Sequence, residues 1–255
     1  MQVITRLGFI FVALILATGS RAADYDFEAP GRVVAFADVH GAYDDWVALL
    51  QELKVIDAQL NWSGGTTHLV SLGDLIDRGP GSRQVVRLLM KLDKQADQAG
   101  GAVHMVLGNH EVMVMVGDLR YVSREEFAAF AGEETGAQRE ELFAQYRRYN
   151  PGGDEATVRA TFDEQYPPGY AALRKAYSRQ GTLGWWLSQQ PFVIKVNDKV
   201  YTHGGIAKAP ASNSLSALNT SLRKEYYAYL ESMETLHEAG QLPLHVSYGE
   251  RLPFL

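Results

Sequence analysis

The chain has 255 residues, of which 46% are apolar and 21% charged, a composition typical of a folded globular domain. This composition excludes a disordered or collagen-like chain. The formal net charge of −6 argues against a nucleic-acid binder that relies on attraction to phosphate. The chain contains no cysteine, which excludes disulfides, thiolate metal sites and a cysteine nucleophile. Any metal ion must therefore be bound by Asp, Asn, Glu or His.

Residues 1–22 have the pattern of a secretory signal peptide. An arginine precedes the apolar stretch from Leu7 to Ala17, which is too short to span a bilayer. Ser20 and Ala22 then form a small-x-small cleavage site. We expect cleavage after Ala22, a folded domain over 23–255, and a periplasmic or secreted protein without stable membrane association after cleavage. An uncleaved membrane anchor is the alternative.

Short apolar runs alternate with amphipathic stretches in the first half of the domain. The β-branched runs predict strands, and apolar residues three and four positions apart predict helices between them. The expected strands are 31–37, 68–72 and 103–107, and the expected helices are 46–53 and 82–92. This alternation predicts an α/β domain with functional loops where the strands end.

The amino-acid composition changes over about 118–181, where charged residues are dense, tyrosines recur and Pro-Gly pairs interrupt the chain. We interpret this segment as a mainly helical insertion within the domain. An apolar hairpin with Asn197-Asp198 at its turn is expected next, followed by an amphipathic helix. These last elements are the strands 192–196 and 199–202 and the helix 221–238.

Polar residues follow four of the expected strands at the point where each strand ends. They lie in the motifs Asp38-Val-His40-Gly, Gly-Asp74-Leu-Ile-Asp77-Arg78-Gly, Gly-Asn109-His110-Glu and His203-Gly-Gly. Asp74 follows Asp38 by 36 residues and Asn109 follows Asp74 by 35, each interval the length of one strand–helix–strand unit. Successive strand ends should therefore lie side by side at one edge of a sheet, and their polar side chains should converge.

Carboxylate, amide and imidazole ligands of this kind suit two divalent cations. One carboxylate can bridge the two ions, and a water held between them becomes a hydroxide nucleophile near neutral pH. Arg78 can bind phosphate oxygens as a planar fork. His110, held by Asp77, can protonate the leaving oxygen. The motifs therefore predict hydrolysis of a phosphate ester at a dinuclear metal site.

The four ordered motifs resemble those of calcineurin-like metallophosphoesterases, and more narrowly those of the phosphoprotein phosphatases. The signal peptide and the long insertion look most like the bacterial Shewanella-like protein phosphatases. The resemblance covers roughly Arg32 to Ala207. It implies a metallophosphoesterase β-sandwich, in which a pair of sheets lies between helices and the site lies at the sheet edges.

The resemblance also implies a role for each residue of the motifs. The first metal would be bound by Asp38 and His40, the second by Asn109 and His203, and Asp74 would bridge both. Arg78 would hold the phosphate, while Asp77 and His110 would form the proton-donating dyad. The metals would be Mn, Fe or Zn. The substrates would be phosphomonoesters on proteins, peptides or small molecules, including phosphotyrosine and phosphoserine or phosphothreonine, and not nucleic acid.

Two features of the family pattern are missing. No Gly-His dipeptide follows Gly205 to supply a further metal ligand, and no second phosphate-binding arginine can be assigned. The closing strands of the second sheet are also missing, so we expect a C-terminally truncated chain with an incomplete second sheet. His245 is a weak substitute for the missing metal ligand, because a surface or strand position is the simpler interpretation. Arg251 is a weak substitute for the missing phosphate-binding arginine. We expect His237, which lies in a polar helix, to be solvated.

Two alternative functions remain open. The missing ligands favour a catalytically impaired homologue that binds metal or phosphate without turnover. A dinucleoside polyphosphate hydrolase shares the same set of motifs. Outside the motifs, we expect Glu111 to brace the helix that follows it and the tyrosines of the insertion to pack.

Overall fold

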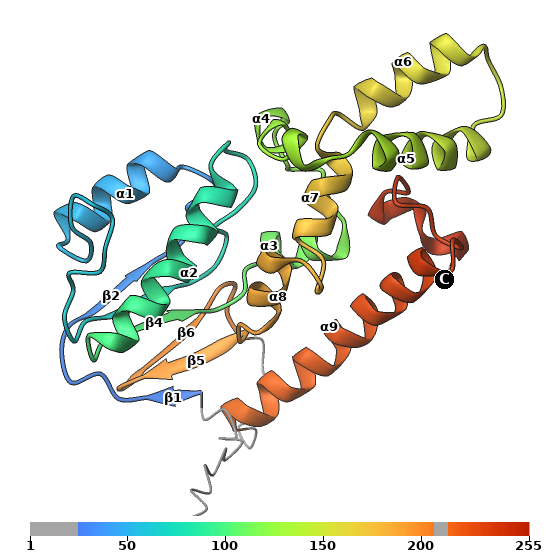
Figure 1. Cartoon of the computed structure of the whole chain (residues 1–255). Coiled ribbons are helices and arrows are strands. Elements are labelled where there is room, and N and C mark those ends of the chain that lie inside the picture. The colour runs from blue at the N-terminus through green and yellow to red at the C-terminus, as the bar shows by residue number, and fades with distance from the viewer. Residues whose placement is uncertain (1–24, 207–213, 255) are drawn as a thin grey trace, which may run out of the picture.

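The computed structural model describes residues 25–206 and 214–254, so the predicted signal peptide lies outside the described residues. These residues form two three-stranded sheets with helices around them (Figure 1). One sheet has the order β2-β3-β4 and the other β1-β5-β6. The strands are β1 (Asp26–Phe27), β2 (Val33–Phe36), β3 (His68–Ser71), β4 (Ala102–Met105), β5 (Val193–Val196) and β6 (Lys199–Thr202).

The sheet β2-β3-β4 is parallel throughout, as the alternation of strands and helices predicts. Phe36 pairs with Ser71, and Ser71 pairs with Met105, so the three strands end at the same level. The central strand β3 is fully buried, whereas Ala35 in β2 is exposed. The prediction of a buried first strand is wrong because β2 has a neighbour on one side only among the described strands.

Helices α1 (Tyr43–Glu52) and α2 (Ser82–Gln98) connect the parallel strands. Both confirm predicted helices, but α2 continues six residues beyond the predicted end at Leu92. The extension includes the good helix formers Lys94, Gln95 and Ala96, and Ala96 continues the buried face. Because the strands end at the same level, the loops that carry the polar motifs meet at one edge of the sheet.

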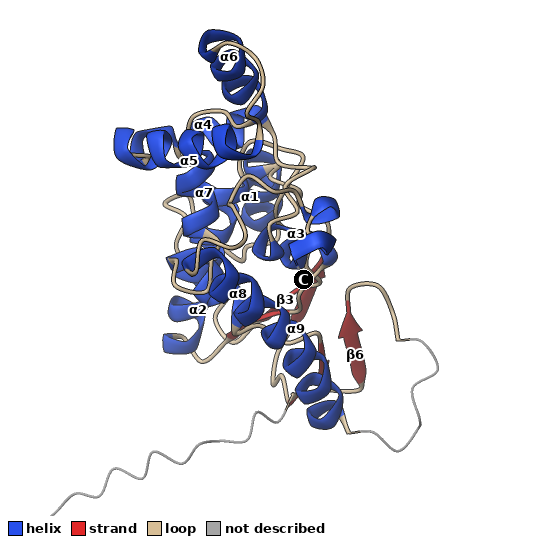
Figure 2. Ribbon diagram, turned by 90° about the vertical axis from the view of Figure 1, so that its right-hand side faces the viewer, coloured by secondary structure: helices blue, strands red, loops and turns tan. Residues whose placement is uncertain are grey.

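The segment 118–181 is helical and, with its helices α5 and α6, projects at one end of the molecule away from the strands (Figures 1 and 2). Its helices are α4 (Arg124–Ala128), α5 (Gly136–Tyr149), α6 (Glu155–Gln165) and α7 (Tyr170–Ala176), with a 3-10 turn at Ala131–Glu133. Tyr146, Phe162 and Tyr166 pack their rings with centroids 5.5–5.6 Å apart. This cluster continues the main hydrophobic core into the segment and confirms the packing role of Tyr146 and Tyr166.

His245 lies in the same aromatic cluster and not at the surface. Its ring packs against Tyr146, Tyr149 and Tyr166, and only 6% of the residue is exposed. The interpretation of His245 as a surface or strand histidine is wrong, because the C-terminal residues fold back onto the helical segment. This packing also separates His245 from the strand ends and removes it as a substitute ligand.

After α8 (Thr182–Ser188), strands β5 and β6 form the predicted antiparallel hairpin, with Asn197 in a left-handed conformation at the turn. Helix α9 (Leu215–Glu238) begins six residues before its predicted start, capped by the Ser214 side chain. The buried Asn219 accepts hydrogen bonds from the N–H groups of Phe192 and Val193. The Asn219 side chain thus joins α9 to the beginning of β5.

The two sheets share a small core of their own, formed by buried residues of both. Its members are Tyr25, Val70, Val106, Ile194 and Val196. This packing, with helices around the two sheets, confirms the predicted α/β arrangement of paired sheets. Among the described residues, no helix combines the length and the apolar character needed to cross a membrane.

The buried Arg251 and the half-buried Arg174 hold the C-terminal end of α3 (Asn109–Val116). The Arg251 guanidinium donates to the carbonyls of Val116 and Gly117, and Arg174 donates to that of Val114. Cations at this position are favoured by the helix dipole. Arg251 is therefore structural and is not a second phosphate ligand.

His237 is half-buried, which corrects the prediction of a solvated side chain. Its Nδ1 lies 2.5 Å from the Leu242 carbonyl oxygen. Burial, together with the nearby Arg174, lowers the pKa of His237 to about 4. The imidazole is therefore neutral at physiological pH and belongs to the packing around the end of α9.

Candidate active site

The loops after β2, β3, β4 and β6 bring all eight predicted site residues to one edge of the parallel sheet. Five of them are non-glycine residues in the left-handed region, with φ between 46° and 71°. They are Asp38, His40, Asp74, Asp77 and Arg78. Such conformations cost about 1–3 kcal/mol each and concentrate at functional sites. The rest of the fold must therefore hold this edge in place.

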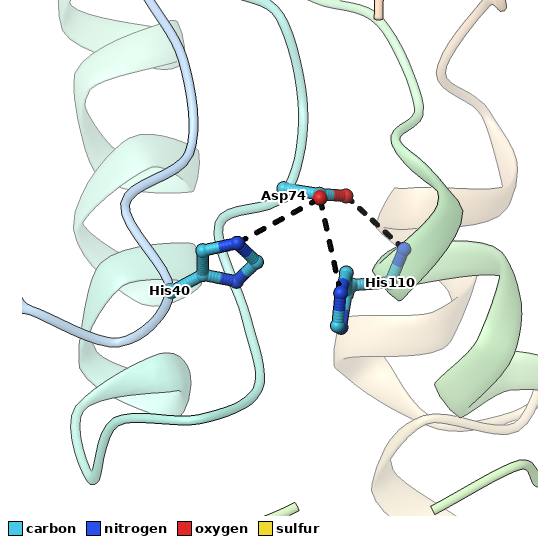
Figure 3. Close-up of side chains that lie close together, drawn as sticks. All are labelled: His40, Asp74 and His110. Atoms are coloured by element: carbon cyan, nitrogen blue, oxygen red, sulfur yellow. Dashed lines mark hydrogen bonds and ion pairs between the residues drawn. The ribbon is translucent and has the colours of Figure 1, made fainter. Parts of the chain in front are cut away.

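Asp74 lies at the centre of the cluster (Figure 3). Its Oδ2 atom is 3.8 Å from His40 Nε2, 3.3 Å from His203 Nε2 and 3.9 Å from His110 Nε2. Its Oδ1 atom accepts the backbone N–H of His110 at 3.1 Å. The residue is 3% exposed, so its carboxylate charge is largely removed from water and requires positive partners.

The two predicted histidine ligands are held with Nε2 facing Asp74. His40 Nδ1 lies 3.0 Å from the Ile76 carbonyl, and His203 Nδ1 lies 2.9 Å from the Leu72 carbonyl. A carbonyl can only accept, so each Nδ1 carries the proton and each Nε2 keeps a lone pair. This is how backbone carbonyls orient metal-binding histidines.

The free atoms of the cluster fit divalent cations. His40 Nε2 is buried and has no hydrogen-bond partner. His203 Nε2 lies 3.1 Å from Asn109 Oδ1 and 3.3 Å from Asp74 Oδ2, so three potential ligand atoms converge there. Asp38, Asp74 and His203 offer ligand atoms within 4.8 Å of one another, and so do His40, Asp74 and His110. The donor set of oxygen and imidazole matches that of Mn, Fe or Zn sites.

Glu111 braces the site. It was predicted to brace only the helix that follows it, but it also bonds to the backbone after two strands. Its carboxylate accepts the backbone N–H groups of Asp74 at 2.9 Å, Leu75 at 2.8 Å and Gly108 at 2.9 Å. Leu75 and Asp74 follow β3, whereas Gly108 follows β4. One fully buried side chain therefore ties two adjacent strand ends together.

His110 and Asp77 form the predicted pair. His110 Nδ1 lies 2.7 Å from Asp77 Oδ2, and both residues are buried. Burial raises the pKa of Asp77, while the bond to His110 opposes that shift. Asp77 thus holds the imidazole by Nδ1, and Nε2 faces the cluster, 3.4 Å from the Arg78 guanidinium.

Tyr121 also lies at the site, although sequence reasoning placed it with the packing tyrosines. Its ring centroid is 5.0 Å from that of His110 and 5.9 Å from the Arg78 guanidinium carbon. Its carbonyl accepts the Arg78 N–H at 2.8 Å. Tyr121 is 44% exposed, so it forms part of the open wall beside Arg78.

Two further residues behind the site were missed from sequence. Ser82 Oγ accepts the Asp77 N–H at 3.0 Å and donates to Glu126 Oε2 at 2.7 Å. Burial raises the pKa of Glu126 to about 8. The serine closely follows the Asp-Arg-Gly motif, which is a usable signal, but nothing in the sequence distinguishes Glu126 from its exposed neighbour Glu125.

An apolar groove of about 770 Å³ borders the cluster on the side of Asn109 and His203. Its other walls include Val112, Phe192 and Leu222, from α3, the start of the hairpin and α9. The groove gives an apolar group room beside the predicted ligands of the second metal.

Comparisons with known proteins agree with this geometry. The calcineurin-like phosphoesterase family matches residues 31–242. Shewanella-like protein phosphatase 2 of Arabidopsis thaliana is 28% identical to this chain, over 77% of this chain and 52% of the length of the Arabidopsis protein. Shewanella-like protein phosphatase 1 of Plasmodium berghei is 26% identical over 76% of this chain and 44% of its own. The chain thus spans about half the length of these curated relatives.

A solved phosphatase structure is also similar to this chain. The crystal structure of a cold-active protein-tyrosine phosphatase from a psychrophilic Shewanella species superimposes with a TM-score of 0.57 at 33% identity. The match covers 79% of this chain and 50% of that one.

The raised pKa of Glu126 predicts a pH-dependent contribution to stability. The folded protein holds a proton on Glu126 between pH 4.5 and about 8, whereas the unfolded chain releases it near 4.5. This contribution is fully present below pH 4.5 and is lost as the pH rises to about 8. Glu126→Gln cannot ionise, so its stability relative to wild type should increase between pH 5 and 8, on the order of a few kcal/mol at most.

Urea unfolding of the metal-free protein at several pH values measures this difference. Glu125→Gln, an exposed neighbour on α4, is the matched control and should show no such trend. Parallel pH curves for wild type and Glu126→Gln would show that Glu126 titrates normally.

Proposed function

The chain belongs to the calcineurin-like phosphoesterase family, and we propose that it is a metal-dependent phosphomonoesterase. The observation that carries this proposal is the convergence on Asp74 of two histidines whose Nε2 atoms lie within 3.8 Å of its carboxylate. Bound divalent cations would supply charge stabilisation of the phosphate and a water of lowered pKa. Asp38 and His40 would hold one ion, Asn109 and His203 the other, and Asp74 both.

The chain's own groups provide the remaining chemistry. The Arg78 guanidinium is exposed at the edge of the cluster, where it can bind phosphate oxygens in a forked arrangement. Asp77 fixes the imidazole of His110 and stabilises its protonated form. His110 Nε2 then donates a proton to the leaving oxygen. No covalent phospho-enzyme is part of this proposal.

We further propose phosphotyrosine on proteins or peptides as the preferred substrate class. The name of the Shewanella protein-tyrosine phosphatase supports phosphotyrosine, and the names of the two curated relatives support a phosphorylated protein as substrate. The apolar groove beside Asn109 and His203 also supports it, because an aromatic leaving group buries more apolar surface there than a serine side chain does.

The test is hydrolysis of p-nitrophenyl phosphate by the purified chain, with Mn²⁺ and after treatment with EDTA. We expect metal-dependent turnover that falls more than about 100-fold in Asp74→Asn, since even outer-sphere partners of metal sites cost 10–100-fold. Asparagine tolerates the left-handed backbone of position 74, so this variant should fold. Circular dichroism checks that it does.

Two outcomes would contradict the proposal. Folded wild-type protein without turnover would favour the catalytically impaired homologue. Faster cleavage of diadenosine tetraphosphate than of a phosphotyrosine peptide would favour the dinucleoside polyphosphate hydrolase. One such relative, the symmetrical bis(5'-nucleosyl)-tetraphosphatase of Cronobacter sakazakii, matches 31% of this chain at 42% identity.

We also propose that the enzyme acts in the periplasm or outside the cell. The proposal depends on the charged, apolar and small-residue pattern of residues 1–22. Mature protein from an exporting host should begin at Ala23. An intact N-terminus on the cell-associated protein would contradict cleavage after Ala22.

A further inference from the structure

The turn at Asp77 and Arg78 carries two of the proposed catalytic groups in an unfavourable backbone conformation. Their φ angles are 71° and 67°, and neither residue is glycine. Two successive side chains in the left-handed region do not hold themselves there. The turn must be held by bonds from outside it.

Those bonds come from two places in the chain. The Arg78 N–H donates to the carbonyl of Tyr121 at 2.8 Å. The Asp77 N–H donates to Ser82 Oγ at 3.0 Å, and Ser82 in turn donates to Glu126 at 2.7 Å. Both Tyr121 and Glu126 belong to the helical segment 118–181, so this segment holds the turn from behind.

Glu126 decides which way the Ser82 hydroxyl points. A hydroxyl has one proton, and when that proton is bonded to Glu126 the lone pairs of Ser82 Oγ are free to accept from Asp77. Ser82 is 0% exposed and Glu126 1%, so water does not replace either partner. Removal of the carboxyl group releases the hydroxyl to rotate, and the Asp77 N–H loses a fixed acceptor.

We propose that Glu126 is a positioning residue, which acts through Ser82 to hold Asp77, and hence His110, in the geometry for proton donation. This inference rests on the proposed function. Because Asp77 bonds His110 at 2.7 Å, movement of its backbone displaces the proton donor. Arg78 is held separately through Tyr121, so binding of the phosphate should change less.

A leaving-group comparison separates positioning from general structural support. Phenyl phosphate releases a phenol with a pKa near 10, as for tyrosine, and needs the proton from His110. p-Nitrophenyl phosphate releases a much weaker base and depends less on that proton. Loss of folded protein lowers both rates equally, whereas a misplaced proton donor lowers the rate on phenyl phosphate more.

The experiment measures kcat and KM for both esters in wild type, Glu126→Ala and Glu126→Gln, with Glu125→Ala as the exposed control on the same helix. For Glu126→Ala we expect kcat on phenyl phosphate to fall about 10- to 100-fold, the range expected when a catalytic group is displaced. The fall on p-nitrophenyl phosphate should be several-fold smaller, and KM should change little. Glu126→Gln keeps an acceptor for Ser82 and should recover most of the rate.

Ser82→Ala provides a second variant in case Glu126→Ala does not fold, and it should show the same leaving-group difference. Histidine NMR of the metal-free protein adds a readout independent of turnover. The low-field Nδ1 proton of His110, bonded to Asp77, should be present in wild type and Glu126→Gln and weakened in Glu126→Ala.

Equal losses on the two esters, together with an unchanged His110 proton signal, would overturn the positioning role. Wild-type protein that hydrolyses neither ester would instead overturn the proposed function. In that case the His110 signal alone decides whether Glu126 holds the Asp77–His110 pair.

Discussion

The arrangement of the site depends on one buried carboxylate, that of Glu111. It accepts three backbone N–H groups, two from the end of β3 and one from the end of β4. Without this carboxylate the buried donors would be unpaired, at a cost of about 1–3 kcal/mol each. Because Asn109 and His110 begin the helix that carries Glu111, the brace also sets their side chains against Asp74.

The backbone around this brace is unusually close. A Cβ atom on Gly73 would lie 2.3 Å from the nitrogen of Gly108, so only glycine permits this approach. The His40 N–H donates to the Asp74 carbonyl at 3.0 Å and the Asp38 N–H to the Gly73 carbonyl at 3.2 Å. The strained loops are therefore bonded to one another, and the parallel sheet below provides the rigid support that positions metal ligands accurately.

The parts of the fold that were predicted correctly follow from local patterns. Apolar periodicity identified β3, α2 and the hairpin, and the spacing of Asp38, Asp74 and Asn109 placed three strand ends at one edge. The motifs also identified the group around Asp74 because each carries several polar residues that a buried strand does not otherwise contain.

The residues whose partners were not predicted from sequence share a different physical cause. Glu126 lies 44 residues from Ser82, and His245 lies 79 residues from Tyr166, so both partnerships depend on how the helical segment and the C-terminal residues fold back. The same holds for Arg251, whose partners are backbone carbonyls at the end of α3. A carbonyl carries no sequence signature, so side chains that bond to backbone cannot be paired from sequence alone.

The central claim is that Asp74 is shared by two cation sites, and anomalous diffraction from crystals of the chain soaked in Mn²⁺ tests it most directly. The account predicts two peaks about 3.5–4 Å apart. One should be bound by Asp38, His40 and Asp74, the other by Asp74, Asn109 and His203. A single peak, or a peak bound by His110 in place of His203, would contradict the account.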